Sequence, residues 1–181
     1  VADFYKSRIH PTNHNFLSSG IVGKHVSLPS LKMTLKEKIY DHCLNVLNNK
    51  INTHRATLDD LKESASNETK STAGDKHETA LAMLQIEQKT TAAQLEHLLG
   101  QKQLLTRLLP VAHEVRVTNG SLVKTSKGYF YLSIPIGKLI VDGTTVTALS
   151  AMSPLGSRLM GLAVGDSLTV SGITYLIESI E

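Results

Sequence analysis

Apolar residues recur every three to four positions through residues 34–109, the spacing that lines one face of an α-helix. In the first half of this stretch they are Leu35, Ile39, Cys43, Val46, Ile51, Leu58 and Leu61. In the second half they approach a seven-residue repeat, with Thr91 filling one slot, at Ala80, Leu84, Thr91, Leu95, Leu98, Leu105 and Leu109. The pattern predicts two long helices, each with one apolar stripe.

A polar stretch separates the two predicted helices. Residues 64–75 are mostly small and polar and include Gly74, so we expect the chain to turn there. Asp75, followed three residues later by Glu78, has the pattern of a helix N-cap with its capping-box partner. Two helices of about 30 residues joined by a short turn must lie antiparallel, as a rod of roughly 45 Å. Residues 33–110 are therefore predicted to be an antiparallel coiled-coil finger with its tip at about 64–78.

The periodicity changes after Pro110, which ends the second helix because proline cannot donate the next backbone hydrogen bond. Short β-branched and aromatic runs follow, separated by turn pairs such as Asp142-Gly143 and Ser171-Gly172. The predicted strands cover 115–117, 122–124, 129–134, 138–141, 144–146 and stretches within 167–180, and a short helix is expected over 154–162. Residues 111–181 are predicted to form a small β-rich domain, so the fold class is α+β.

Residues 1–32 show neither period, and we expect them to be a disordered or artefactual extension. Translation is expected to start at Met33, where the helical pattern opens. The formal net charge of +3 comes entirely from this extension, which has four basic residues and one acidic residue. Residues 33–110 have ten of each sign and residues 111–181 five of each, so a general phosphate-binding surface is not expected.

The single cysteine, Cys43, excludes an internal disulfide and Cys-rich zinc sites, and its place on the apolar helix face predicts a buried packing residue. No apolar run approaches the roughly 18 residues that span a bilayer, and residues 1–32 lack the apolar core of a signal peptide. We expect a cytoplasmic protein with no membrane partner, and we expect it to be a monomer.

No catalytic motif of a conventional enzyme is found in the sequence, and the eight histidines are dispersed. The informative feature is charge along the finger, because six acidic residues oppose three basic ones between Asp59 and Glu78. Carboxylates at the end of a rod offer hard oxygen ligands to Mg²⁺, and two of them three residues apart can share one ion or flank one water. The alternative is that Asp75 and Glu78 only cap a helix. Their spacing alone does not decide between these interpretations.

Two segments resemble the Gre transcript-cleavage factor family. Residues 150–166 are similar to the family's SPL…L.G…VGD signature, which lies in an FKBP-like domain. The matching positions are Ser153, Pro154, Leu155, Gly161, Gly165 and Asp166. The tip sequence Gly74-Asp75-Lys76-His77-Glu78, followed by Glu87-Gln88, is similar to the family's GD..EN…EQ motif. The resemblance covers about residues 33–181.

The resemblance implies a transcription elongation factor of bacterial RNA polymerase, without enzymatic activity or a cofactor of its own. In that family the coiled coil enters the polymerase secondary channel, where its tip acids help to hold a second Mg²⁺ and a water at the polymerase active centre. This stimulates cleavage of backtracked RNA, so contact with the nascent RNA 3′ end is indirect. Carried over by position, Asp75 would hold the metal and Glu78 would orient ligand or water. The matched residues of the C-terminal domain, Ser153 to Asp166, would contact the polymerase rim.

The tip departs from the family pattern in three respects. Thr79 stands in place of the usual Asn, the aromatic residue that normally follows is missing, and Lys76 and His77 lie between the two acids. A regulator that occupies the channel without stimulating cleavage is therefore the alternative function. A coiled-coil adaptor with no polymerase contact and a peptidyl-prolyl isomerase are further alternatives.

Overall fold

The computed structural model describes residues 33–70, 75–108 and 115–181, with side chains described at 33–68, 78–108 and 115–181. The predicted extension 1–32 and the turn residue Gly74 lie outside the described residues. From Met33 to Glu181 the chain forms one compact unit. In the described part of the chain, neither long helix is apolar enough to cross a membrane.

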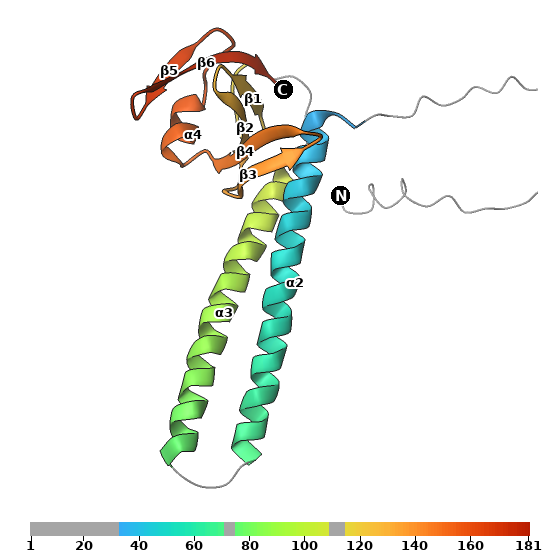
Figure 1. Ribbon diagram of the computed structural model, residues 1–181, viewed down its shortest axis with the longest axis vertical. Coiled ribbons are helices and arrows are strands. Elements are labelled where there is room, and N and C mark those ends of the chain that lie inside the picture. The colour runs from blue at the N-terminus through green and yellow to red at the C-terminus, as the bar shows by residue number, and fades with distance from the viewer. Residues whose placement is uncertain (1–32, 71–74, 109–114) are drawn as a thin grey trace, which may run out of the picture. The chain divides into compact units, whose positions relative to one another are not determined.

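Two long helices, α2 (Leu35–Lys70) and α3 (Asp75–Arg107), lie side by side as a hairpin (Figure 1). A capping box starts α2: the Thr34 backbone N–H donates to the Glu37 carboxylate at 2.8 Å, and the Glu37 N–H donates to the Thr34 hydroxyl at 3.2 Å. The 36 residues of α2 make a rod of about 54 Å at about 1.5 Å per residue. The prediction of a two-helix hairpin is confirmed.

The predicted start of the turn at Ser64 is wrong, because α2 continues as a helix to Lys70. Ser, Asn and Thr are weak helix formers but do not break a helix, and 64–70 contains neither Gly nor Pro. Packing supplies the rest of the explanation. Ala65, one helical turn after Leu61, is half-buried, and the Gln88 side-chain amide of α3 donates to the Leu61 carbonyl at 3.0 Å.

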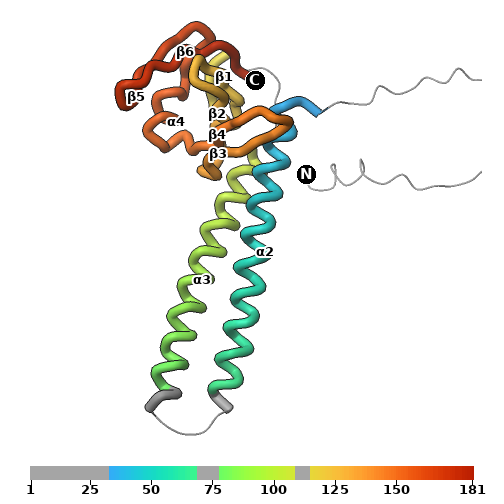
Figure 2. Tube along the Cα trace, in the orientation of Figure 1, coloured from blue at the N-terminus to red at the C-terminus, as the bar shows by residue number. Residues whose placement is uncertain are grey.

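The base of the hairpin and the sheet share one hydrophobic core. Ile39, Cys43 and Leu105 are fully buried in the same cluster as Leu122 and Tyr131 of the sheet. The predicted burial of Cys43 is confirmed. Strand β3 (Gly137–Val141) lies next to the first turns of α2 (Figure 2), where Lys38 pairs with Asp142, the residue that directly follows this strand. The hairpin is therefore anchored to the β domain by burial of apolar side chains and only secondarily by this exposed ion pair.

The C-terminal part is a six-stranded mixed sheet with one short helix, which confirms the α+β class. The elements are β1 (Leu122–Thr125), β2 (Gly128–Ser133), β3 (Gly137–Val141), β4 (Thr144–Ser150), α4 (Pro154–Leu159), β5 (Ser167–Val170) and β6 (Ile173–Ile180). The strand order is β3-β4-β2-β1-β6-β5, and only the β2–β4 pair is parallel.

Side chains alternate between the two faces of β2, as the period of a strand requires. Tyr131 belongs to the core shared with the hairpin, whereas Phe130 and Leu132 belong to a second core with Leu159 of α4. Asp142-Gly143 and Ser171-Gly172 form two-residue hairpin turns in which both residues have positive φ, 50° and 75° in the first and 50° and 78° in the second. This is the backbone conformation that favours glycine in such turns.

Three strand and helix predictions need correction. Residues 115–117 form no strand, because Arg116 makes only an isolated bridge with Ala163. Strand β4 runs beyond the predicted 144–146 to Ser150, since its parallel pairing with β2 continues that far. Helix α4 stops at Leu159 instead of residue 162, because Gly161 takes a left-handed φ of 81° and donates to the Val117 carbonyl.

Candidate functional site: the hairpin end and the signature loops

Asp75 is the first residue of α3, and Glu78 lies in the first turn of that helix with its side chain exposed. The side chains of Asp75, Lys76 and His77 lie outside the described residues, so the predicted pairing of the two carboxylates is not tested. Carboxylates are favoured at this position because the start of a helix carries partial positive charge. Within the described residues, no three His, Cys, Asp or Glu side chains are grouped as a metal site.

The end of the hairpin remote from the sheet is acidic well beyond this first turn. We call residues 59–68 of α2 and 78–87 of α3 the distal segment. It contains one basic residue, Lys62, which pairs with Asp59 at 3.1 Å. It contains six acidic residues, Asp59, Asp60, Glu63, Glu68, Glu78 and Glu87. The distal segment therefore repels phosphate and attracts cations.

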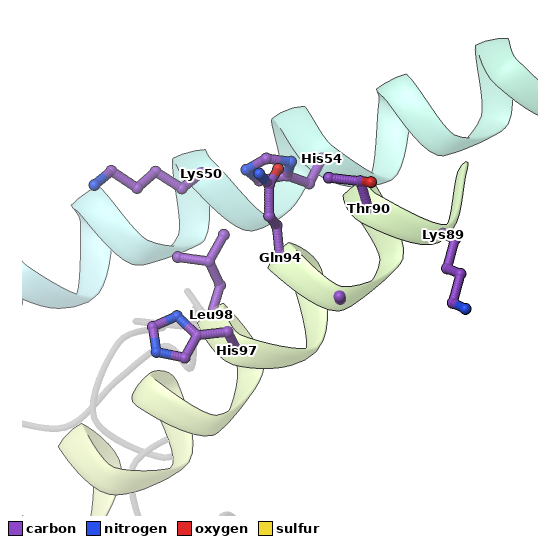
Figure 3. A pocket seen from close by; sticks show the side chains of 8 residues that line it. Lys50, His54, Lys89, Thr90, Gln94, His97 and Leu98 are labelled. Atoms are coloured by element: carbon purple, nitrogen blue, oxygen red, sulfur yellow. The ribbon is translucent and has the colours of Figure 1, made fainter. Parts of the chain in front are cut away.

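A groove between α2 and α3 nearer the sheet has the opposite charge (Figure 3). It has a volume of about 830 Å³, and no carboxylate is among its lining residues. Lys50 and His54 of α2 line it together with residues of α3 (Lys89, Thr90, Ala93, Gln94, His97, Leu98). We call it the stem groove. A cationic groove of this kind attracts anionic groups such as phosphates or carboxylates.

Charges summed over residues 33–110 cancel, but the sequence on either side of the acidic stretch is basic, with Lys50 and Lys89 among its charges. A finer signal was present: residues 42–58 contain no Asp or Glu. The seven-residue repeat also places Thr90 and His97, seven positions apart, on the same side of α3. The sequence alone did not predict the register of α2 against α3, which places these residues beside Lys50 and His54.

The signature residues at the start of α4 build the turn after β4. Ser153 is the N-cap of α4 and its hydroxyl accepts from the Gly156 N–H at 3.0 Å. Pro154 is the first helical residue and is exposed, and Leu155 packs half-buried against the second core. Gly156 is buried, and a Cβ there would collide with the Ser150 carbonyl oxygen.

The remaining signature residues shape the loop from α4 to β5. Gly161 accepts from the Arg116 guanidinium at 2.9 Å, and its own N–H donates to the Val117 carbonyl at 2.8 Å. Gly165 has φ 91° and donates to the Ile177 carbonyl at 2.9 Å. The Asp166 carboxylate accepts from the Ala163 N–H at 2.8 Å. These residues, which were predicted to bind a partner, hold the backbone of the loop through their hydrogen bonds.

Apolar side chains that the sequence reading passed over are exposed beside the signature. Met152, directly before Ser153, is 92% exposed, and Val115 and Val164 are 85% and 57% exposed. The antiparallel bridge between Arg116 and Ala163 sets Val115 opposite Val164. Exposed apolar groups of this kind suit a protein interface. For Met152 and Val164 the signal in the sequence was an apolar residue directly before a matched signature position, Ser153 or Gly165.

Two titratable groups in the shared core have no role in this site. Burial raises the pKa of the Cys43 thiol to about 12, so the reactive thiolate is scarce at neutral pH. Burial also raises the pKa of Tyr131 well above its ordinary value. Both groups act as packing residues.

Comparison of the chain with protein-family models and with curated proteins finds no match. Function is therefore inferred from the chemistry and position of the site residues, because a fold by itself does not specify a function.

Proposed function

We propose that the protein is a transcription elongation factor that binds bacterial RNA polymerase and inserts the end of its helical hairpin into the secondary channel, where it stimulates cleavage of backtracked RNA. The observation that carries the proposal is the acidic distal segment on a stiff hairpin of 36 and 33 residues. The base of this hairpin is fixed in the core of the domain that contains the signature loops. A hairpin of this kind presents carboxylates about 50 Å from its anchor.

Asp75 and Glu78 are the residues that would act at the polymerase active centre. Carboxylate oxygens are the ligands that Mg²⁺ prefers, and the two acids are on the first turn of α3, where the chain emerges from the tip. A second Mg²⁺ held there by Asp75 and by polymerase groups would polarise a water and neutralise the charge on the cleaved phosphodiester. Glu78, whose side chain is exposed, would orient that water. The protein needs no cofactor of its own.

The β domain would dock on the polymerase rim through the signature region. Pro154, Met152 and Val164 are exposed apolar groups there, while Ser153, Gly161 and Asp166 fix the loops that present them. Leu155 and Gly165 would contribute through the shape of the same loops. The exposed apolar pair Val115 and Val164 supports this assignment, because apolar groups at the centre of an interface contribute most of its affinity.

A channel-occupying regulator without cleavage activity is the second candidate. It is favoured by Thr79, which is exposed where the resembling family has Asn, and by Lys76, whose positive charge opposes a nearby Mg²⁺. Both candidates need the same insertion of the hairpin. They differ only in the chemistry at its tip.

The test is RNA shortening in backtracked complexes assembled with purified bacterial RNA polymerase. The wild-type chain should shorten the RNA, and the double variant Asp75→Asn/Glu78→Gln should slow shortening by at least about 100-fold with polymerase affinity retained. A matched control, Asp60→Asn/Glu63→Gln, removes the same charge from α2 and should cleave normally. If the wild type changes pausing without shortening the RNA, the regulator is correct. If it does not bind polymerase, both candidates are wrong.

A further inference from the structure

The stem groove contains positive charge that the hairpin itself does not neutralise. Among the described residues, neither the Lys50 nor the Lys89 ammonium is paired with a carboxylate. No acidic residue lies three or four positions from either lysine, so neither can form an ion pair along its own helix. Lys62 of the distal segment differs, because it pairs with Asp59 three residues before it. Both lysines of the stem groove are exposed, and their charges are open to a partner.

The positive charges are spread along the groove. In Figure 3 Lys50 and Lys89 lie toward opposite ends of the groove, with His54 and Gln94 between them. The lining residues of α3 run from 89 to 98, about 13 Å at about 1.5 Å per residue. The imidazole and the amide between the lysines can each donate a hydrogen bond to an anionic oxygen. This arrangement fits an elongated occupant with at least two anionic groups better than one small ion.

The surroundings of the groove favour carboxylates over a strand of nucleic acid. A phosphodiester backbone has a charge at every nucleotide and needs a basic track that continues past the groove. Toward the tip, α3 instead exposes Met83 and Ile86, each 67% accessible, and then the carboxylate of Glu87. No arginine lines the groove, although arginine is the residue that matches phosphate with two parallel hydrogen bonds. A short acidic protein segment can place its carboxylates in the groove and end before Glu87.

The charge along the hairpin allows such a segment only one position. The distal segment, with six acidic residues and one basic residue, begins two residues from Lys89 on α3. Sliding an acidic partner toward the tip would therefore bring like charges together. Lys89 lies about 21 Å from Asp75 along α3, at about 1.5 Å per residue. A partner held in the stem groove thus fixes where the tip lies relative to that partner.

We propose that the stem groove binds an acidic segment of the polymerase channel wall, with two or more carboxylates, and that this contact sets the depth of hairpin insertion. The inference rests on the proposed function, because it takes the polymerase as the partner. Lys50 and Lys89 are positioning residues in this proposal, separate from the metal-binding role of Asp75 and Glu78.

The test is the affinity of the full chain for core RNA polymerase without nucleic acid, measured by titration at low and at high salt. Lys50→Gln/Lys89→Gln should weaken binding about tenfold at low salt and much less at high salt, because salt screens exposed charges. The matched control is Arg55→Gln/Arg107→Gln, which removes two positive charges from exposed positions of the same two helices outside the groove. It should bind like the wild type.

Two further variants test whether charge is the cause. Lys50→Glu/Lys89→Glu should weaken binding about 100-fold at low salt, because carboxylates would then face carboxylates. Lys50→Arg/Lys89→Arg keeps both charges and should bind within about twofold of the wild type. Both positions are exposed, so the free energy of unfolding should change by less than about 0.5 kcal/mol in each variant.

Other outcomes separate the two proposals. If the wild type binds polymerase and the groove variants bind equally well, or the control weakens binding as much as they do, the stem groove is not the contact and the proposed function stands. If the wild type does not bind polymerase, the proposed function fails and this inference fails with it. If Lys50→Gln/Lys89→Gln lowers the affinity for a single-stranded RNA oligonucleotide and leaves that for core polymerase unchanged, the groove binds phosphates and the proposal is wrong.

Discussion

Close to the sheet, the seam between α2 and α3 contains fully buried side chains, whereas in the distal segment Leu61 is its one buried residue and the other seam residues are half-buried or polar. Ile39, Cys43 and Leu105 are completely inaccessible and join the core of the β domain. In the distal segment Leu61 is buried but Leu84 is only half-buried, and Gln88 bridges the helices through a hydrogen bond. Burial of apolar surface is the main stabilising term, so the base stabilises the fold. The distal segment contributes less, and its polar seam fixes the register of the helices.

The largest effect is expected at the base. Leu105→Ala removes a fully buried side chain from the shared core and should lower the free energy of unfolding by about 3 kcal/mol. Leu84→Ala in the half-buried distal seam should cost about 1 kcal/mol. Urea unfolding of the two variants measures the difference. Equal losses would contradict the division between base and distal segment.

A second effect tests whether the β domain and the base unfold together. Gly156→Ala forces a methyl group against the Ser150 carbonyl and the Leu149 side chain, and it should cost about 2 kcal/mol. Because the base shares a core with the sheet, helical and β signals should still be lost in one transition. A hairpin that keeps its helicity after the sheet has unfolded would show that the two are independent. Gly172→Ala, at a turn with open space but φ 78°, serves as the comparison for backbone strain alone.

A smaller loss is expected in the distal seam. Gln88→Ala removes the side-chain bond to the Leu61 carbonyl and should lower the free energy of unfolding by about 1 kcal/mol. Gln85→Ala on the exposed side of the same helix is the control and should change it by less than about 0.5 kcal/mol. Hydrogen exchange of amides in α2 and α3 should show faster opening of the distal segment in the Gln88 variant. Unchanged exchange there would mean that the bond does not hold the register.

The smallest effect is expected for the ion pair between the base and the sheet. Lys38 and Asp142 are 40% and 57% exposed, so solvent screens their attraction. Lys38→Met should change the free energy of unfolding by about 0.5 kcal/mol or less, and high salt should remove the difference. A loss comparable to that of Leu105→Ala would show that electrostatics, and not burial, anchors the hairpin.

Local sequence signals predicted most of the fold. Helix periodicity predicted both long helices and the burial of Cys43. The alternation of strand residues, together with the pairs Asp142-Gly143 and Ser171-Gly172, predicted the hairpin turns. The errors arose where tertiary contacts override local preference. Ser64 looked like the start of a turn, but contact with α3 continues the helix to Lys70. Residues 115–117 looked like a strand, but their pairing is limited to the single bridge between Arg116 and Ala163.

The candidate site was less accessible to sequence reasoning. The Asp75–Glu78 spacing predicted an acidic tip, but spacing does not show which charged side chains of two helices lie next to one another. Lys50 and Lys89 are 39 positions apart and line one groove. The exposure of Met83 and Ile86 was hidden for a similar reason, because α3 carries apolar residues on more than one face and the periodic pattern identifies only the face that is packed.

Insertion of the hairpin can be tested by locating the end of the hairpin in a stalled RNA polymerase complex. A photo-activatable crosslinker can be attached through Lys76→Cys, because the buried Cys43 thiol, with its pKa near 12, reacts slowly and can stay in place. Crosslinks are expected from position 76 to the 3′-terminal RNA segment. None are expected from a second variant, Thr53→Cys, which labels an exposed residue in the middle of α2. Crosslinks from position 53 alone, or none from position 76 in a complex that demonstrably contains the protein, would contradict insertion of the hairpin.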